Sequence, residues 1–325
     1  MEPEEAEYFE KHGLIFQEVI AHGGYGMIFK MYSPSYNQIF ALKKISSELF
    51  HPEEIDCFKL IDDNRILNLY KSYAFNGYNY LLMEYCPDDV EKLIKRKNGK
   101  FSHTELVQLT HDIISCVKAV HDRNIAHCDI KPANFLIDHY GRIKICDFGL
   151  SKIIHEELQS KVFSGTKLFM SPEIVNKRAH DPFLADIWSI GVTLYVLCTN
   201  SYPFYAFSTN VLFEKISRGI FDETIIPDNC LRMMISMCLD LEPSKRPSLD
   251  ELLAHPFLNT YTHHKLAAPV HPHGSHKQML KCTMAMSMNY DMITKPRINV
   301  RKSVTSMIEG NRIKLQKSKT LDFFV

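Results

Sequence analysis

The stretch that decides the fold reads HCDIKPAN at residues 127–134, and DFG follows at residues 147–149. Asp129 can accept a proton from a hydroxyl group, and Lys131 can neutralise a phosphoryl group during its transfer. The amide of Asn134 and the carboxylate of the second motif are hard oxygen ligands of the kind that Mg²⁺ prefers. The two motifs therefore supply the parts that phosphoryl transfer requires.

Two upstream elements fit the same chemistry. Residues 20–28 read IAHGGYGMI, and their glycines permit a tight hairpin whose backbone N–H groups approach phosphate oxygens. A plain glycine hairpin is an equal alternative for this segment by itself. Lys43 follows the small residue Ala41 on an expected strand, where its ammonium group reaches phosphates while Ala41 lies against a flat base. An exposed strand lysine is the alternative for Lys43 taken alone.

Together the motifs closely resemble those of the eukaryotic protein kinase family, serine/threonine type, over about residues 14–258. The resemblance continues through GTKLFMSPE at residues 165–173, DIWSIG at residues 186–191 and Arg246. Among kinases, the chain looks most like the calcium/calmodulin-dependent and NIMA-related groups. The resemblance implies an α+β, two-lobed protein kinase fold, in which an N-lobe antiparallel sheet with one helix precedes a mainly helical C-lobe.

The family resemblance also assigns the site residues and implies ATP and Mg²⁺ as cofactors. Asp129 and Lys131 are catalytic in this assignment, and Asn134 and Asp147 bind the metal. Met83 is the gatekeeper, and residues 84–86 form the adenine-binding hinge. The residues implied for ATP binding are Ile20, Ala21, Gly23, Gly24, Tyr25, Gly26, Ile28, Ala41, Lys43, Glu54, Met83, Glu84, Cys86 and Leu136.

Further contacts are implied by the resemblance for the protein interior. Glu173 and Arg246 are expected to pair, and Asp186 is expected to anchor the catalytic loop. A hydrophobic stack is expected to link the lobes, and ordinary core packing is the alternative explanation for its members. These are Leu69, Phe58, His127 and Phe148.

Hydrophobic periodicity separates a strand-rich part of the chain from a helical part. Short alternating runs predict a small antiparallel sheet at residues 13–17, 27–32, 38–45 and 79–85. A Ser102-x-x-Glu105 capping box opens a helical region. Helices are also predicted at residues 184–198, 211–218, 231–239 and 249–254.

The resemblance implies the domain boundaries, and a shift in composition marks the last segment. We expect a kinase domain at residues 14–258, with an N-lobe at about 14–83, a hinge at 84–87 and a C-lobe at 88–258. Residues 1–13 are an acidic N-terminal extension. In residues 259–325, Lys and Arg outnumber Asp and Glu, so we expect a basic, flexible C-terminal tail.

Charge and cysteine content restrict the partners. The 38 basic and 38 acidic residues cancel, so no net field draws the chain towards nucleic acid or an anionic membrane. No stretch approaches the roughly 20 apolar residues of a membrane span, and we expect neither a nucleic-acid partner nor a transmembrane segment. The nine cysteines lack zinc-site spacing, which favours reduced thiols. A cytoplasmic or nuclear location is expected.

The sequence departs from the kinase pattern in the N-lobe. Ala21 replaces the first glycine of the phosphate loop, and nucleotide still fits if its φ is negative. Ten residues separate Lys43 from Glu54, fewer than is usual in the family, so the helix that carries Glu54 is expected to be short. Glu53 is a second candidate for the pairing.

A further departure concerns activation. Cys128 stands where the family usually has the arginine that clamps a phosphorylated activation loop, and a neutral thiol cannot form such charge-assisted bonds. The position that usually carries the phosphothreonine is Val162. We therefore hypothesise that the activation segment orders without phosphorylation at that position.

Partner preference is only partly visible. The resemblance implies protein substrates. Basophilic relatives carry carboxylates that bind an arginine upstream of the acceptor, and the matching positions here are Val90, or nearby Asp89, and Val196, so no strongly basophilic preference is indicated. Residues 298–307 of the tail are basic with apolar residues, a pattern that suits docking into the chain's own active site or binding to calmodulin or lipid. A solvated tail is the alternative.

The sequence thus predicts an ATP-dependent serine/threonine protein kinase. A pseudokinase that acts as a nucleotide-binding scaffold is the main alternative, because Ala21, Cys128 and the short helix depart from the pattern. A small-molecule phosphotransferase is less consistent with the segment that ends in SPE at residues 171–173.

Overall fold

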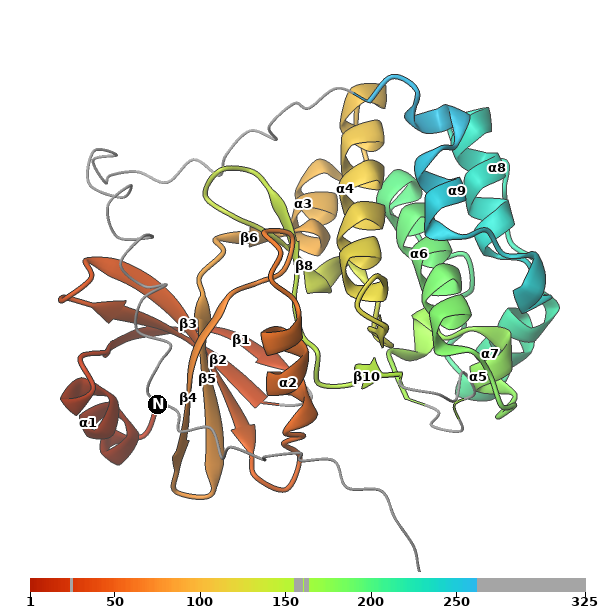
Figure 1. Cartoon of the computed structure of the whole chain (residues 1–325). Helices are drawn as coiled ribbons and strands as arrows, with labels where there is room; N and C mark the ends of the chain where they lie inside the picture. The colour runs from red at the N-terminus through yellow and green to blue at the C-terminus, as the bar shows by residue number, and fades with distance from the viewer. Residues whose placement is uncertain (24–25, 155–159, 161–163, 262–325) are drawn as a thin grey trace, which may run out of the picture. The chain divides into compact units, whose positions relative to one another are not determined.

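The computed structural model describes residues 1–23, 26–154, 160 and 164–261, which form two lobes (Figure 1). The N-lobe contains a five-stranded antiparallel sheet of order β1-β2-β3-β5-β4, as predicted. The run that becomes β4 was not predicted. The strands are β1 (Ile15–Gly23), β2 (Gly26–Ser33), β3 (Gln38–Ser46), β4 (Leu69–Phe75) and β5 (Tyr78–Glu84).

The central strand β3 is covered on both faces. Neighbouring residues of a strand point to opposite faces of the sheet, so Lys43 and Lys44 point apart. Lys43 pairs with Glu54 in α2 (Glu53–Leu60), whereas Lys44 pairs with Glu5 in α1 (Pro3–Lys11). The two helices therefore pack on opposite faces of the sheet, and Figure 1 shows them on either side of it.

The helix α1 lies in the predicted acidic extension and is not predicted as a helix by the sequence analysis. Pro3 occupies its first turn, and the backbone N–H of Glu2 donates to the Glu5 carboxylate at 3.1 Å. Glu5 and Phe9 lie four residues apart on one helix face, and both are buried. The Phe9 ring packs edge-on against Tyr80 of β5, so α1 is part of the N-lobe core.

The Glu5 carboxylate connects α1 to the sheet by polar contacts. It accepts hydrogen bonds from the Lys44 ammonium group and from the Tyr80 hydroxyl, the latter at 2.7 Å. Burial raises the pKa of Glu5, but these partners outweigh burial and hold the pKa below its ordinary value. A carboxyl group with a lowered pKa stabilises the fold above its unfolded pKa, and this contribution disappears as the pH falls through the folded pKa.

We therefore expect Glu5→Gln to lower the free energy of unfolding by about 1–3 kcal/mol at pH 7, because the amide weakens two buried hydrogen bonds. The difference from wild type should shrink as the pH falls below the ordinary carboxyl value of 4.5. Urea unfolding at neutral and acidic pH measures both effects. The control is Glu7→Gln on the exposed side of α1, where Glu7 forms a surface ion pair with Lys11; equal effects of the two substitutions would contradict the account.

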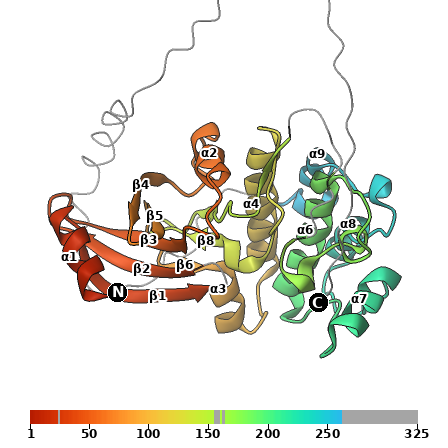
Figure 2. The same ribbon diagram turned by 90° about the horizontal axis from the view of Figure 1, so that it is seen from below.

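The C-lobe is mainly helical, as expected. Figure 2 shows the strands of the N-lobe on one side and the C-lobe helices on the other. The helices are α3 (Val90–Lys97), α4 (His103–His121), α5 (Pro172–Val175), α6 (Pro182–Thr199), α7 (Thr209–Arg218), α8 (Asn229–Cys238) and α9 (Leu249–Leu253). Short strands complete the lobe: β6 (Asp88–Asp89), β7 (Ile125–Ala126), β8 (Phe135–Ile137), β9 (Ile143–Ile145) and β10 (Lys152–Ile153).

The predicted helices of this lobe are confirmed, with ends that differ by at most two residues. The helix α4 begins at the predicted capping box, in which the Glu105 backbone N–H donates to the Ser102 hydroxyl and the Glu105 carboxylate accepts from the Ser102 backbone N–H. The helix α3 was not predicted. Its first turn is capped by Asp89, whose carboxylate accepts a hydrogen bond from the Lys92 backbone N–H at 2.8 Å.

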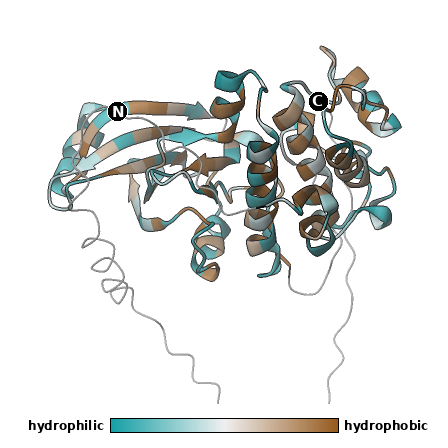
Figure 3. Cartoon of the chain, turned by 90° about the horizontal axis from the view of Figure 1, so that it is seen from above, coloured by the Kyte–Doolittle hydropathy of each residue, from teal (hydrophilic) through white to brown (hydrophobic). Residues whose placement is uncertain are grey.

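The C-lobe core is built around α4 and α6, whose residues dominate one large hydrophobic cluster. Most C-lobe helices carry hydrophobic residues on part of their surface and hydrophilic residues on the rest (Figure 3). Among the described helices, α6 alone is long and apolar enough to cross a membrane, and 78% of its apolar window is buried inside the protein. Burial of this kind is what a central core helix requires.

Candidate active site

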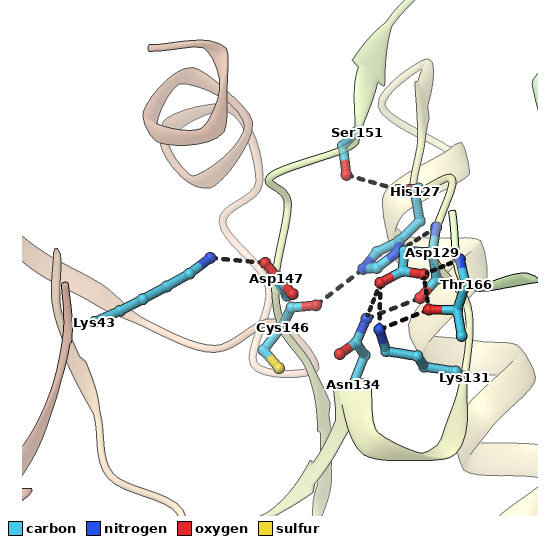
Figure 4. A network of polar contacts seen from close by, with 9 residues as sticks. All are labelled: Lys43, His127, Asp129, Lys131, Asn134, Cys146, Asp147, Ser151 and Thr166. Carbon is cyan, nitrogen blue, oxygen red and sulfur yellow. Dashed lines mark hydrogen bonds and ion pairs between the residues drawn. The ribbon is translucent and has the colours of Figure 1, made fainter. Parts of the chain in front are cut away.

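Asp129 is the centre of a hydrogen-bond network in the loop between β7 and β8 (Figure 4). Its Oδ2 accepts from Lys131 Nζ at 2.6 Å, and its Oδ1 accepts from the Thr166 hydroxyl at 2.8 Å and backbone N–H at 3.1 Å. The Asn134 amide donates to the backbone carbonyl of Asp129 at 2.8 Å. These bonds fix a buried carboxylate in one orientation, so that it can accept a hydroxyl proton without rearrangement.

Asp186 of α6 anchors the loop that carries Asp129 through hydrogen bonds to its backbone. The two carboxylate oxygens of Asp186 accept the backbone N–H groups of His127 at 2.8 Å and Cys128 at 2.9 Å. The His121 ring nitrogen Nε2 lies 2.9 Å from Asp186 as well. Cys128 has a left-handed backbone with φ of 63°, which is uncommon for a non-glycine residue. The predicted anchoring by Asp186 is confirmed, and its contact with His121 was not predicted.

Asn134 and Asp147 lie next to this network as candidate metal ligands (Figure 4). Asn134 uses its amide nitrogen on Asp129, which leaves its side-chain oxygen for a ligand. The backbone N–H of Cys146 donates to the Asn134 carbonyl at 3.0 Å, so the residue before Asp147 is fixed to Asn134. An amide oxygen and a carboxylate fit Mg²⁺, a hard cation that needs few protein ligands. These two side chains would hold the ion, and this role stays a prediction.

Lys43 joins the two lobes through a pair of carboxylates. Its Nζ lies 2.7 Å from Glu54 Oε1 and 2.7 Å from Asp147 Oδ1. Burial lowers the pKa of Lys43, but the two carboxylates outweigh burial and raise its pKa above the ordinary value. Burial likewise raises the pKa of Asp147, and Lys43 reverses that shift and lowers it. Lys43 is therefore a charged ammonium group in contact with Asp147, one of the two candidate metal ligands.

The partner of Lys43 is Glu54 and not the alternative Glu53. Glu54 is buried, and α2 is eight residues long, so the expected short helix still delivers the carboxylate. The contact between Lys43 and Asp147 was not predicted, because it joins residues 104 positions apart. The pattern of charges gives no local signal for such a contact.

The glycine-rich hairpin is formed by β1 and β2, with Gly23 opposite Gly26. Gly24 and Tyr25 lie outside the described residues. Gly26 has φ of 150°, and a Cβ atom built on it would lie 1.8 Å from the Lys44 carbonyl oxygen, so no side chain fits there. Ala21 lies in β1 opposite Ile28 and is absent from the described residues with positive φ. Its methyl group is therefore compatible with the backbone conformation, which is the condition under which nucleotide still fits.

We expect Gly26→Ala to be far more damaging than Gly77→Ala. Both glycines have left-handed backbones, but Gly77 in the turn between β4 and β5 has no atom within 4 Å of its added Cβ. Both substitutions carry a conformational cost at positive φ, and only the first adds a collision with the backbone of β3. The free energy of unfolding should fall by about 1–3 kcal/mol more for Gly26→Ala, measured by urea denaturation. Equal losses would contradict the close approach.

Residues 14–258 match the family model described as the protein kinase domain. The chain belongs to the protein kinase family. The family resemblance of the motifs and the two-lobed fold are thereby confirmed.

Curated relatives of this kinase chain are larger proteins. This chain is 32% identical over 280 residues to "Probable serine/threonine-protein kinase nek3" of Dictyostelium discoideum, and the aligned region covers 79% of this chain and 24% of that protein. It is 39% identical over 178 residues to "Mitogen-activated protein kinase kinase kinase 1a" of Physcomitrium patens, covering 54% and 23%. The human "NUAK family SNF1-like kinase 2" is 29% identical over 258 residues, covering 77% and 41%. The chain thus spans less than half of each relative.

The segment expected to form the hinge begins at Glu84, the last residue of β5, and its role as a hinge stays a prediction. Met83 of β5 is buried in a hydrophobic cluster, and Cys86 packs against the same cluster. The Glu84 carboxylate lies 2.9 Å from the ammonium group of Lys144 and accepts from the Asn68 amide at 2.8 Å. Lys144 is buried and was not predicted as a hinge partner.

The walls expected around adenine come from both lobes. Ala41 of β3 pairs with Met83 of β5, and Leu136 packs against the cluster that contains Met83. Ile28 lies opposite Lys43 in the sheet. Ile20 is a half-buried residue of β1. The structure brings these side chains to the same region of the kinase domain, and their role in ATP binding stays a prediction.

The predicted hydrophobic stack between the lobes is formed in the kinase domain. The centre of the Phe148 ring lies 4.9 Å from the centre of the Phe58 ring and 5.4 Å from the centre of the His127 ring. Phe58 and Leu69 both pack against the cluster of the N-lobe. Phe148 is buried, so the DFG segment is held in the conformation that places Asp147 on Lys43.

The end of the activation segment is tied to the C-lobe by a buried ion pair. Arg246 donates to both carboxylate oxygens of Glu173, at 2.7 and 2.9 Å, as predicted. Burial raises the pKa of Glu173, and the Arg246 guanidinium outweighs it and lowers that pKa. Val162, the position that lacks a phosphorylatable residue, lies outside the described residues.

Proposed function

We propose that this chain transfers the γ-phosphoryl group of ATP to serine or threonine hydroxyls of proteins. The observation that carries the proposal is the network around Asp129, in which a buried carboxylate is held between Lys131 and Thr166. Such a carboxylate orients an acceptor hydroxyl and receives its proton. Family membership supports the same activity.

The other side chains have separate tasks in this proposal. Lys43, oriented by Glu54, binds phosphate oxygens, and Lys131 compensates charge next to the acceptor. Asn134 and Asp147 would hold Mg²⁺, which would supply positive charge beside the phosphate oxygens. Because these groups are already in place, the protein contributes positioning and electrostatic stabilisation rather than covalent chemistry.

Hydroxyl specificity is tested with matched acceptor peptides. Lys131 in the catalytic loop, together with Thr166, resembles the serine/threonine group of kinases rather than the tyrosine group, and the 2.9 Å contact between Lys131 Nζ and the Thr166 hydroxyl supports this specificity. Peptides that differ only in Ser, Thr or Tyr at the acceptor position are incubated with purified chain and labelled ATP. We expect label on Ser and Thr peptides. Labelling of the Tyr peptide at an equal rate would refute the assignment.

A pseudokinase is separated from an enzyme by the same preparation. A scaffold of this fold binds nucleotide without transferring phosphate to any acceptor. The retained side chains Lys43, Asp129, Asn134 and Asp147 favour the enzyme. Nucleotide binding by folded wild-type chain without transfer would favour the scaffold.

Activation without loop phosphorylation is part of the proposal. Cys128 is a neutral group there, because burial raises the pKa of its thiol. We expect phosphatase-treated chain to keep its kcat. A loss of activity would contradict this hypothesis and require separate tests of Ser160, Ser164 and Thr166.

Substrate and location complete the proposal. Val90 and Val196 are buried, and the Asp89 carboxylate is occupied by Lys92, which agrees with an enzyme that is not strongly basophilic. The eight described cysteines are free, which suits a reducing intracellular compartment. The tail segment at residues 298–307 lies outside the described residues, and its docking or calmodulin binding stays a hypothesis.

A further inference from the structure

Three aromatic residues lie exposed in the loop between α6 and α7. Tyr202, Tyr205 and Phe207 are 36%, 51% and 98% exposed, respectively, and we call them the aromatic patch. The contacts of the active site described above involve none of them. Neighbouring exposed aromatic side chains mark binding surfaces on proteins, because water solvates their apolar rings poorly.

The aromatic patch is connected to the acceptor side of the active site. The Tyr202 ring packs edge-on against Phe169 with ring centres 5.9 Å apart. Phe169 donates its backbone N–H to the Thr166 carbonyl in a tight turn, and Thr166 bonds Asp129. Tyr202 therefore lies within about 20 Å of the Asp129 carboxylate. An extended peptide covers that distance with about six residues.

The loop that carries the patch is held in place. Its start is tied to the end of α3 by the hydrogen bond from the Asn200 amide to Asn98 Oδ1 at 3.0 Å. The Tyr205 carbonyl accepts from Lys215 of α7 at 2.8 Å. The Tyr205 and Phe207 rings meet at 5.6 Å in an edge-on arrangement. The surface is thus formed before a partner arrives, which reduces the ordering cost of binding.

A cation lies beside the patch. Lys167 is exposed, and its ammonium group lies 3.5 Å from the hydroxyl of Thr209, two residues beyond Phe207. Across residues 1–23, 26–154, 160 and 164–261, no carboxylate lies within ion-pair distance of Lys167. An acidic partner is therefore favoured over a basic one. This charge disfavours the chain's own basic tail as the occupant.

We propose that the aromatic patch and Lys167 form a docking surface for protein substrates that carry a large apolar side chain, with a carboxylate beside it, within about six residues of the phosphorylated hydroxyl. A substrate segment is the occupant because Lys167 directly follows Thr166, which bonds Asp129, and Phe169 of the same segment packs against Tyr202. The proposal rests on the proposed kinase activity and adds a substrate preference to it. Phe207 and Tyr205 supply apolar contact, and Lys167 supplies the charge.

Peptide kinetics test the proposal. A parent peptide has one serine among small polar residues, and a Phe-Glu pair is moved through the six positions on either side of it. For wild-type chain we expect one placement to raise kcat/KM about tenfold through a lower KM. Phe207→Ala should abolish this gain without changing kinetics on the parent peptide. Tyr140→Ala, an exposed aromatic residue in the turn between β8 and β9, should leave the gain intact.

Binding of the fluorescein-labelled peptides is measured in parallel without ATP. If wild-type chain transfers no phosphate but binds the Phe-Glu peptide through Phe207, the docking surface stands and the proposed activity fails. If transfer occurs and no placement is favoured, or if Phe207→Ala keeps the gain, the docking surface is refuted. Displacement of the peptide by a synthetic copy of residues 298–307 more strongly than by an acidic peptide would also refute it, in favour of the tail.

Discussion

Asp129→Asn is expected to lower kcat for peptide phosphorylation by about two to four orders of magnitude, the usual contribution of a positioned general base. Asparagine keeps the size of the side chain and one acceptor oxygen for Thr166, but it cannot take the hydroxyl proton. The residues expected to bind nucleotide, including Lys43, lie in another part of the site. The affinity for ATP should therefore stay close to that of wild type. Steady-state kinetics and nucleotide titration measure the two quantities.

A surface substitution provides the control for that experiment. Asp250 is exposed, and its carboxylate forms an ion pair with Lys118 at the protein surface, so Asp250→Asn should leave kcat unchanged. Thermal unfolding of all three proteins checks that the fold is retained. An Asp129→Asn protein that is folded and keeps more than about a tenth of the wild-type kcat would contradict a proton-accepting role for Asp129.

Arg246→Met is expected to cause the largest loss of stability, about 3–5 kcal/mol, because it leaves the Glu173 carboxylate buried without its partner. The Arg246 side chain is fully buried and donates to Glu173, to the Leu184 carbonyl at 2.8 Å and to the Asp240 carbonyl at 3.0 Å. Methionine fills part of the volume and replaces none of these bonds. Urea denaturation measures the change in the free energy of unfolding.

Two further variants separate the buried pair from ordinary loss of charge. Arg218→Met removes an exposed helical ion pair with Glu214 and should cost less than about 1 kcal/mol. Adding Glu173→Gln to Arg246→Met removes the unpaired carboxylate, so the double variant should be more stable than the sum of the single losses predicts. Additive losses, or equal losses at Arg218 and Arg246, would contradict the account.

The active-site residues were largely predictable from sequence because phosphoryl transfer fixes their types and spacing. Asp129, Asn134 and Asp147 belong to short motifs, and their local neighbours hold them: Lys131 lies two residues from Asp129 and bonds it directly. The capping box at Ser102 is likewise a local signal, and the helix begins where it indicates. Residues whose position depends on nearby chain are therefore recovered from the sequence.

Contacts between distant segments were not predictable in the same way. Phe9 and Glu5 hold α1 on the sheet through residues such as Tyr80 and Lys44, which lie in strands far along the chain. An acidic segment with few apolar residues gives a weak helical pattern by itself. Its sequence signals, Pro3 at the first turn and the spacing of Glu5 and Phe9, were present but not decisive. Tertiary packing decided the structure of this segment.

The central claim is that Asp129, together with Lys43 and its partners Glu54 and Asp147, forms a magnesium-dependent site for phosphoryl transfer. The most direct measurement uses purified full chain of verified fold, γ-labelled ATP and a serine/threonine peptide array, with and without Mg²⁺. The account predicts that label passes to serine or threonine peptides only when Mg²⁺ is present, and that nucleotide binding strengthens with the ion. Folded chain that neither binds ATP in the presence of Mg²⁺ nor labels any peptide would contradict it.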